Sequence, residues 1–137
     1  MKKVNRLGIL AVTAVSITLF SYTGLKMADD WNIPAEYKTM KNPAKATADN
    51  IEVAKALYRQ HCQSCHGRTG LGDGPKAAEL KTHAGDFSLK EFQAQSDGVL
   101  YYKTTFGKDE MPNYDKKIRS DEDRWLLVHF MRTMAAK

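Results

Sequence analysis

The stretch that decides the fold is YRQHCQSCHGRTGLGDGP, residues 58–75. It contains both cysteines of the 137-residue chain, Cys62 and Cys65, and His66 follows the second one directly. Side chains three and four positions apart share a face of a helix, so these three residues can point toward one bound group. The glycines that follow allow the chain to turn tightly beside that group.

Two thiols and an adjoining imidazole match the chemistry of covalent haem attachment. The thiols of Cys62 and Cys65 add to the two haem vinyl groups, and His66 offers its imidazole to the iron, as in the Cys-x-x-Cys-His signature. Structural zinc needs four ligands, and the chain has no second cysteine–histidine pair with suitable spacing. A thioredoxin-type dithiol follows a strand, and a simple disulfide leaves His66 unexplained. The sequence therefore predicts one covalent haem c.

The pattern around this motif predicts an all-α domain of three to four short helices wrapped around the haem, with long loops between them. The first helix is expected from about Asn50 to about Ser64, with Asp49 and Glu52 as a capping box. Further helices are expected at about 77–81, from Ser96 or Asp97 to Gly107, and after Ser120 through the apolar run 125–131. So few helices bury little apolar surface, and the haem supplies the missing interior.

Residues 1–25 have the pattern of an export segment. Lys2, Lys3 and Arg6 precede a run without charge from Leu7 to Leu25, as in secreted proteins. The run fits a cleaved signal peptide, but it also fits a retained hydrophobic helix, since roughly 20 residues cross a bilayer of about 30 Å. Both alternatives place the rest of the chain on the periplasmic side of the inner membrane, either soluble or anchored through residues 7–25.

Residues 26–48 form a linker or strap before the domain at 49–137. The segment has no apolar periodicity and contains Pro34 and Pro43. It is either a mobile tether or a strap in which three side chains lie against the domain: Trp31, Ile33 and Tyr37.

The charge balance argues against nucleic acid as a partner. The chain carries a net charge of +5, and it falls to +2 without the first 24 residues, which contain three basic residues and no acid. The remaining basic residues are interleaved with acids and form no basic run.

Three pieces of the chain, in this order, resemble class I c-type cytochromes: ALYRQHCQSCHGRTGLGDGP, SDGVLYYKTTFGKDEMPNY and DEDRWLLVHFMRTM. The resemblance is to bacterial single-haem types, which are small periplasmic carriers or cytochrome subunits of oxidases, and it covers roughly residues 51–134. It implies the cytochrome c fold and redox protein partners such as a membrane oxidase, a reductase or a quinol-oxidising complex. One departure is Ala54, where the family often has glycine at the crossing of the first and last helices.

The resemblance also implies that Met111, which precedes a proline late in the chain, is the second axial ligand of the iron. The residues favour the same choice, because Met111 lies in an irregular segment between Gly107 and Pro112 that can aim a thioether sideways. The other methionines are expected in the export segment, in the linker, or as core residues of the last helix. Three histidines are expected to have no metal role: His61, His83 and His129.

Supporting residues are predicted around this site. In the family, Pro75 lies near the proximal histidine, and its carbonyl helps to orient the imidazole. The apolar walls are expected to be Phe87, Leu100, Tyr101, Phe106, Tyr114, Trp125, Leu126 and Phe130. Six lysines either steer an acidic partner or are an ordinary solvated face: Lys76, Lys81, Lys103, Lys108, Lys116 and Lys117.

The predicted function is single-electron transfer in a respiratory chain, by an outer-sphere mechanism through His/Met-ligated haem iron. A thioether ligand raises the reduction potential relative to two nitrogen ligands, and two strong axial ligands leave no site for substrate, so the protein is expected to be a carrier and not an enzyme. The first alternative is a dedicated cytochrome c subunit of a larger membrane oxidoreductase. The second is a haem enzyme or sensor with an open axial site.

Overall fold

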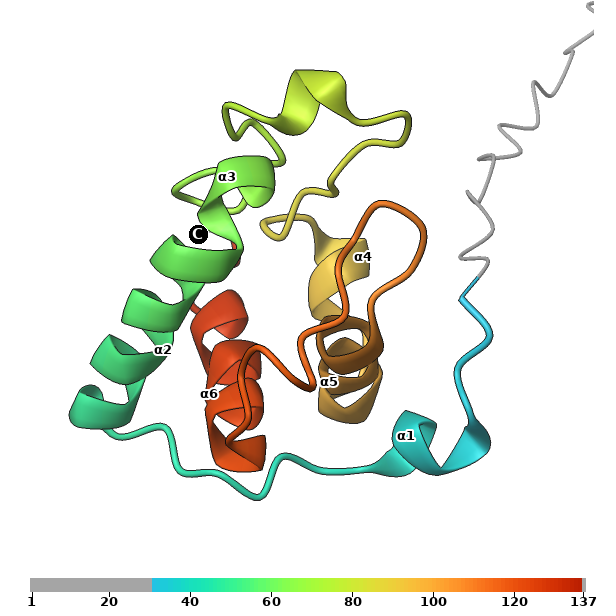
Figure 1. Ribbon diagram of the computed structural model, residues 1–137. Coiled ribbons are helices and arrows are strands. Elements are labelled where there is room, and N and C mark those ends of the chain that lie inside the picture. Colours follow the sequence, from blue (N-terminus) through green and yellow to red (C-terminus); the bar gives the residue numbers. More distant parts are fainter. Residues whose placement is uncertain (1–30, 137) are drawn as a thin grey trace, which may run out of the picture.

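The computed structural model describes residues 31–136, so the predicted export segment and its hydrophobic helix lie outside the described residues. Within the described range the chain is all-helical, which confirms the predicted fold class (Figure 1). Its helices are α1 (Ala35–Thr39), α2 (Ala48–His61), α3 (Gln63–His66), the 3₁₀ turn η1 (Ala77–Glu79), α4 (Lys90–Gln93), α5 (Asp97–Phe106) and α6 (Asp121–Arg132). None of the helices in residues 31–136 has both the length and the apolar character needed to cross a membrane.

The first long helix differs from its prediction at both ends. It is capped by Thr47, whose side chain accepts a hydrogen bond from the Asn50 backbone N–H at 3.2 Å, and not by Asp49. Glu52 pairs with Lys55 at 3.1 Å instead of closing a capping box. The helix ends at His61, and Cys62, with φ −118°, separates it from the single turn of α3. The expected continuous helix to Ser64 is therefore two helices with a break at Cys62.

The other long helices begin where their caps predict. Ser96, and not Asp97, caps α5 by accepting from the Val99 N–H at 3.3 Å, and Ser120 caps α6 by accepting from the Asp123 N–H at 3.1 Å. Gly107 ends α5 with φ +61°, a left-handed conformation that favours glycine.

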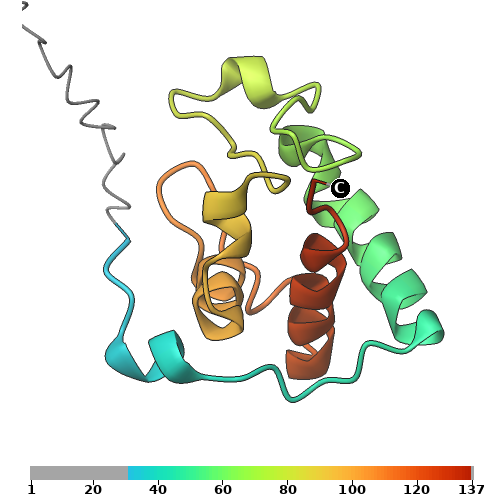
Figure 2. The same cartoon turned by 180° about the vertical axis from the view of Figure 1, so that it is seen from behind.

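The core lies where α6 packs between α2 and α5 (Figures 1 and 2). Ala54 of α2 and Val128 of α6 are both fully buried. The alanine that replaces the family's common glycine thus still allows α2 and α6 to pack together. Tyr101 of α5 stacks on Trp125 of α6 with ring centroids 3.9 Å apart.

Residues 31–47, here called the docked segment, lie along α5 and α6. Ile33 is buried, and the Gly98 N–H of α5 donates to the Met40 carbonyl at 3.2 Å. Further along, the Asn42 amide donates to the Trp125 carbonyl at 2.9 Å, and His129 Nε2 lies 2.9 Å from the Ala44 carbonyl. These contacts pin the docked segment at three points before α2 begins.

Candidate functional site

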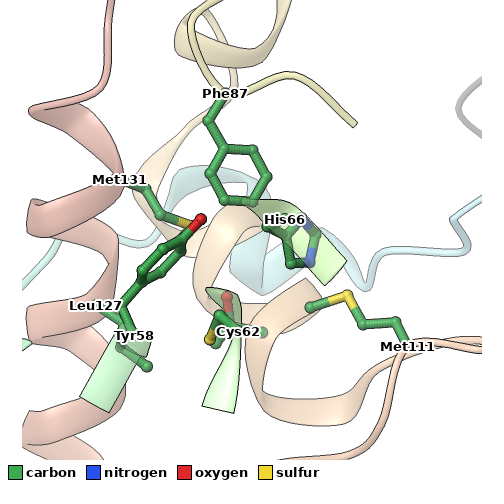
Figure 3. Close-up of a pocket in the computed structure, with 8 residues that line it drawn as sticks. Tyr58, Cys62, His66, Phe87, Met111, Leu127 and Met131 are labelled. Carbon is green, nitrogen blue, oxygen red and sulfur yellow. The ribbon is translucent and has the colours of Figure 1, made fainter. Parts of the chain in front are cut away.

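A small cavity of about 20 Å³ lies between α2, α3, α5, α6 and the segment after α5. Most of its lining is apolar, with one thiol, one imidazole and two thioethers among the side chains (Figure 3). The lining residues are Tyr58, Cys62, His66, Phe87, Thr104, Met111, Leu127 and Met131.

His66 enters the cavity from the end of α3. Burial lowers the pKa of its imidazole to about 4, while the nearby Ala84 backbone acts in the opposite direction. Its buried Nδ1 atom has no hydrogen-bond partner. The Phe87 ring lies against the imidazole, with centroids 4.7 Å apart. His66 is thus a neutral base at physiological pH, as a metal ligand must be.

The predicted role of Pro75 does not match this geometry. No hydrogen bond joins the His66 ring to the Pro75 carbonyl, and the backbone that lies against the ring belongs to Ala84. The loop after His66 instead folds back on α3. Gly74 lies against it, where an added Cβ would come within 2.4 Å of the Ser64 carbonyl oxygen.

Both cysteines are half-buried at the break between α2 and α3. The Cys62 carbonyl accepts from the N–H groups of Cys65 and His66 at 3.2 and 3.0 Å, so all three residues share one tight turn. Burial, and then the neighbouring Cys65, raise the pKa of the Cys62 thiol to about 12. Cys62 lines the cavity directly.

Two tyrosines fix the ends of this turn. The Tyr58 hydroxyl donates to the Gly67 carbonyl at 2.7 Å, and the Tyr114 hydroxyl donates to the His61 carbonyl at 2.6 Å. Because each bond joins the motif to a residue outside it, the cysteines and histidine are held on a rigid support.

Met111 reaches the same cavity from an irregular segment, as predicted. Lys108 and Met111 exchange backbone hydrogen bonds of 3.0 and 2.8 Å, which closes a tight turn after Gly107. The Glu110 carboxylate accepts from the Lys81 backbone N–H at 2.8 Å and ties this turn to the loop before Phe87. The Met111 side chain extends into the cavity toward His66 (Figure 3).

The residues that line the cavity differ from most of those predicted as the apolar walls of the haem site. Among the eight residues, only Phe87 lines the cavity. Leu100, Tyr101, Tyr114, Trp125 and Leu126 are buried but do not line it, Phe130 is half-buried, and Phe106 is 40% exposed on the outer side of α5. Sequence reasoning missed the lining residues Tyr58, Thr104, Leu127 and Met131. A signal existed for two of them, because Leu127 and Met131 are four positions apart on a strongly apolar helix.

The other three histidines are not among the residues that line the cavity. His61 ends α2, with its ring 5.8 Å from that of Tyr114. His83 lies in a loop and accepts from the Gly85 N–H at 3.0 Å, and His129 contacts the docked segment. Within residues 31–136, no three His, Cys, Asp or Glu side chains gather into a possible metal site.

The residues present fit a covalently attached haem. The cavity combines apolar walls, a thiol, a neutral imidazole with an unpaired ring nitrogen, and a thioether that extends toward that imidazole. An axial histidine and methionine are a known ligand pair for haem iron in electron-transfer proteins.

The comparisons with known proteins agree with this chemistry. Residues 49–131 match the family model described as cytochrome c oxidase, cbb3-type, subunit III. A search of curated proteins found no match. A chain of the reducing HAO-like protein complex Kustc0457/Kustc0458 of Kuenenia stuttgartiensis is 30% identical, with a TM-score of 0.62, over 69% of this chain. This chain covers 47% of that one. The c-type cytochrome KustC0563 is 28% identical, with a TM-score of 0.52, over 61% of this chain and 98% of its own length.

Proposed function

Because the chain belongs to the cbb3-type cytochrome c oxidase subunit III family and is a class I c-type cytochrome with covalent haem c, we propose that it carries single electrons in a respiratory chain. The observation that carries this proposal is the convergence of His66 and Met111 on one largely apolar cavity. Two axial ligands leave no coordination site for a substrate, so transfer is outer-sphere and the protein is a carrier, not an enzyme.

Each site residue has a distinct role in this proposal. Cys62 and Cys65 would attach the haem through thioether bonds, and His66 and Met111 would ligate its iron. When bound, the haem supplies an iron that alternates between the ferric and ferrous states, and the Met111 thioether favours the ferrous one. Tyr58, Leu127 and Met131 exclude water from the site.

A second candidate is a dedicated cytochrome c subunit of one larger membrane oxidoreductase, with an oxidase, a reductase or a quinol-oxidising complex as the redox partner. The family description favours it, as does the chain from a protein complex among the similar structures. The docked segment favours it further, because three hydrogen-bonded points leave little freedom between the N-terminal segment and the domain.

The location that suits this role is the periplasmic side of the inner membrane, with residues 7–25 retained as an anchor. The basic start and the uncharged run of these residues support export and anchoring. The intact mass of the natively exported protein tests both points. A mass that includes residue 1 and one haem is expected, whereas a chain that starts after residue 25 would contradict the anchor.

Replacement of Met111 tests the axial ligand. In Met111→Ala we expect loss of the red absorption band of methionine-ligated ferric haem, a lower reduction potential, and carbon monoxide binding by the reduced protein. Met131→Leu is the matched control, because it changes another methionine of the same cavity and should leave the band in place. A band that survives in Met111→Ala would overturn the assignment, because another methionine would then ligate the iron. A wild-type protein that lacks the band and binds carbon monoxide when reduced would favour a haem enzyme or sensor.

A further inference from the structure

One side of α5, together with the docked segment, carries aromatic and apolar side chains that are exposed or half-buried. Gly98, Tyr102 and Phe106 recur every four residues along α5 and therefore share one side of that helix. Phe106 is 40% exposed and Met40 of the docked segment 37% exposed. Tyr37 joins them, with its ring centroid 4.8 Å from Tyr102 and 6.1 Å from Phe106. Tyr37, Met40, Tyr102 and Phe106 are here called the aromatic face.

The chain enters the described structure beside this face. The Lys103 ammonium lies over the ring of Trp31, 5.4 Å from its centroid, and Lys103 directly follows Tyr102. Trp31, the first residue that the structure describes, thus lies against α5, next to the aromatic face.

Only residues 26–30 separate Trp31 from the uncharged run that ends at Leu25. The distance between Leu25 and Trp31 cannot exceed about 22 Å, since an extended chain advances at most about 3.3–3.6 Å per residue. If residues 7–25 span a bilayer, Trp31 and the last turn of α5, where Lys103 contacts it, are held near the membrane surface. The docked segment cannot lengthen the tether without breaking its contacts with Gly98 and Trp125.

From the short distance between Leu25 and Trp31 and from the aromatic side chains beside Trp31, we infer that the aromatic face rests on the lipid interface of the membrane that holds the anchor. The inference rests on the proposed anchoring by residues 7–25. Tyrosine and tryptophan favour the headgroup level, where the ring meets the acyl chains and the polar tip meets water. Two exposed lysines of the docked segment, Lys38 and Lys41, suit phosphate headgroups beside it.

This orientation has a consequence for electron transfer. Phe106 ends α5, and the turn that carries Met111 begins at the next residue, Gly107. The side of the cavity that Met111 forms is therefore held close to the bilayer. The redox partner of the protein would then be reached along the membrane surface.

Photo-crosslinking tests the inference in the full-length holoprotein in phosphatidylcholine vesicles. In the haem-loaded protein the native thiols are consumed, so a new cysteine takes a diazirine label specifically. Phe106→Cys places the label on the aromatic face, and Val53→Cys places it on α2 at a similar exposure, since Val53 is 45% exposed. The absorption spectrum of each labelled protein checks that the haem site has formed.

After irradiation we expect a phosphatidylcholine adduct in the mass spectrum of the Phe106→Cys protein, at a yield several-fold above that of Val53→Cys. Equal yields, or a label at 106 that reacts only with water, in a protein that sediments with the vesicles would overturn the inference and leave the anchoring intact. A protein that stays in the supernatant would overturn both. In native membranes, a label at 106 that crosslinks to protein instead of lipid would also overturn it.

Discussion

Tyr114 shows how a single side chain links the parts of the site. Its backbone N–H donates to the Thr105 carbonyl at 2.9 Å, and its hydroxyl donates to the His61 carbonyl at 2.6 Å, just before the haem motif. It follows the Met111 turn by three residues. The same residue therefore links the segment before His66 to the segment that carries Met111.

Tyr114→Phe should lower the free energy of unfolding by about 1 kcal/mol, because it removes one buried hydrogen bond. Burial raises the pKa of Tyr114 to about 12, so the folded state retains the phenolic proton that the unfolded chain loses near pH 10. The stability that this group contributes is therefore complete below pH 10 and is lost as the pH rises toward 12. Denaturant unfolding measures the free energy of unfolding of the wild type and of Tyr114→Phe at pH 7 and pH 11. The difference between the two proteins should be smaller at pH 11 than at pH 7. A larger difference at pH 11 would contradict this role of the Tyr114 hydroxyl.

Phe106 illustrates why the sequence does not by itself show which apolar side chains lie inside the fold. As an aromatic residue in an apolar stretch it is expected inside, yet it lies on the outer side of α5. Tyr58 was overlooked because a helical tyrosine just before the motif gives no sign in the sequence that its ring turns inward. That Cys62 and His66 face one cavity could be predicted from the spacing of their motif. That Met111 joins them could be predicted from the irregular segment between Gly107 and Pro112.

At the scale of elements, the boundaries depended on capping chemistry. Ser96 and Ser120 were predictable because each lies before an apolar stretch and three residues before an N–H group that needs an acceptor. At α2 the sequence offers Thr47 and Asp49 in close succession, and the pattern does not separate them. The short helices α1, α3 and α4 begin and end at positions that depend on contacts with the rest of the fold. Local sequence patterns carry no information about these contacts.

Thr47→Ala should destabilise the protein by about 1 kcal/mol, because it leaves the first turn of α2 without its side-chain acceptor. Asp49→Ala is the matched control two residues away, and it should cost only a few tenths of a kcal/mol through the helix dipole. Chemical denaturation of the two variants measures the difference. A larger loss in Asp49→Ala would support the capping box that the sequence suggested.

Gly98→Ala tests whether the docked segment belongs to the folded domain. Alanine raises intrinsic helix propensity by about 1 kcal/mol over glycine, so the change should stabilise an uncovered α5. At this position an added Cβ would come within 2.1 Å of the Tyr37 carbonyl oxygen and 2.8 Å of the Met40 Cβ. We therefore expect a net loss of about 1–3 kcal/mol from overpacking, with faster proteolysis inside residues 31–47. An increase in thermal stability would mean that the docked segment is not held on α5.

For the whole molecule, the haem site and the hydrophobic core overlap. Four buried core residues also line the cavity: Tyr58, Phe87, Leu127 and Met131. A domain of this size buries a modest fraction of its chain's surface and is stable only by a small margin. Without the haem, these side chains lose their largest apolar neighbour.

The double variant Cys62→Ala/Cys65→Ala should therefore lose most of its structure along with its colour. The same result is expected for the wild-type chain made in a host that cannot attach haem, which separates the effect of the cofactor from that of the two substitutions. Far-UV circular dichroism and thermal scans should show low helicity and no cooperative transition in both proteins. If either one is colourless yet fully helical and unfolds cooperatively, the polypeptide completes its own core, and the haem serves electron transfer alone.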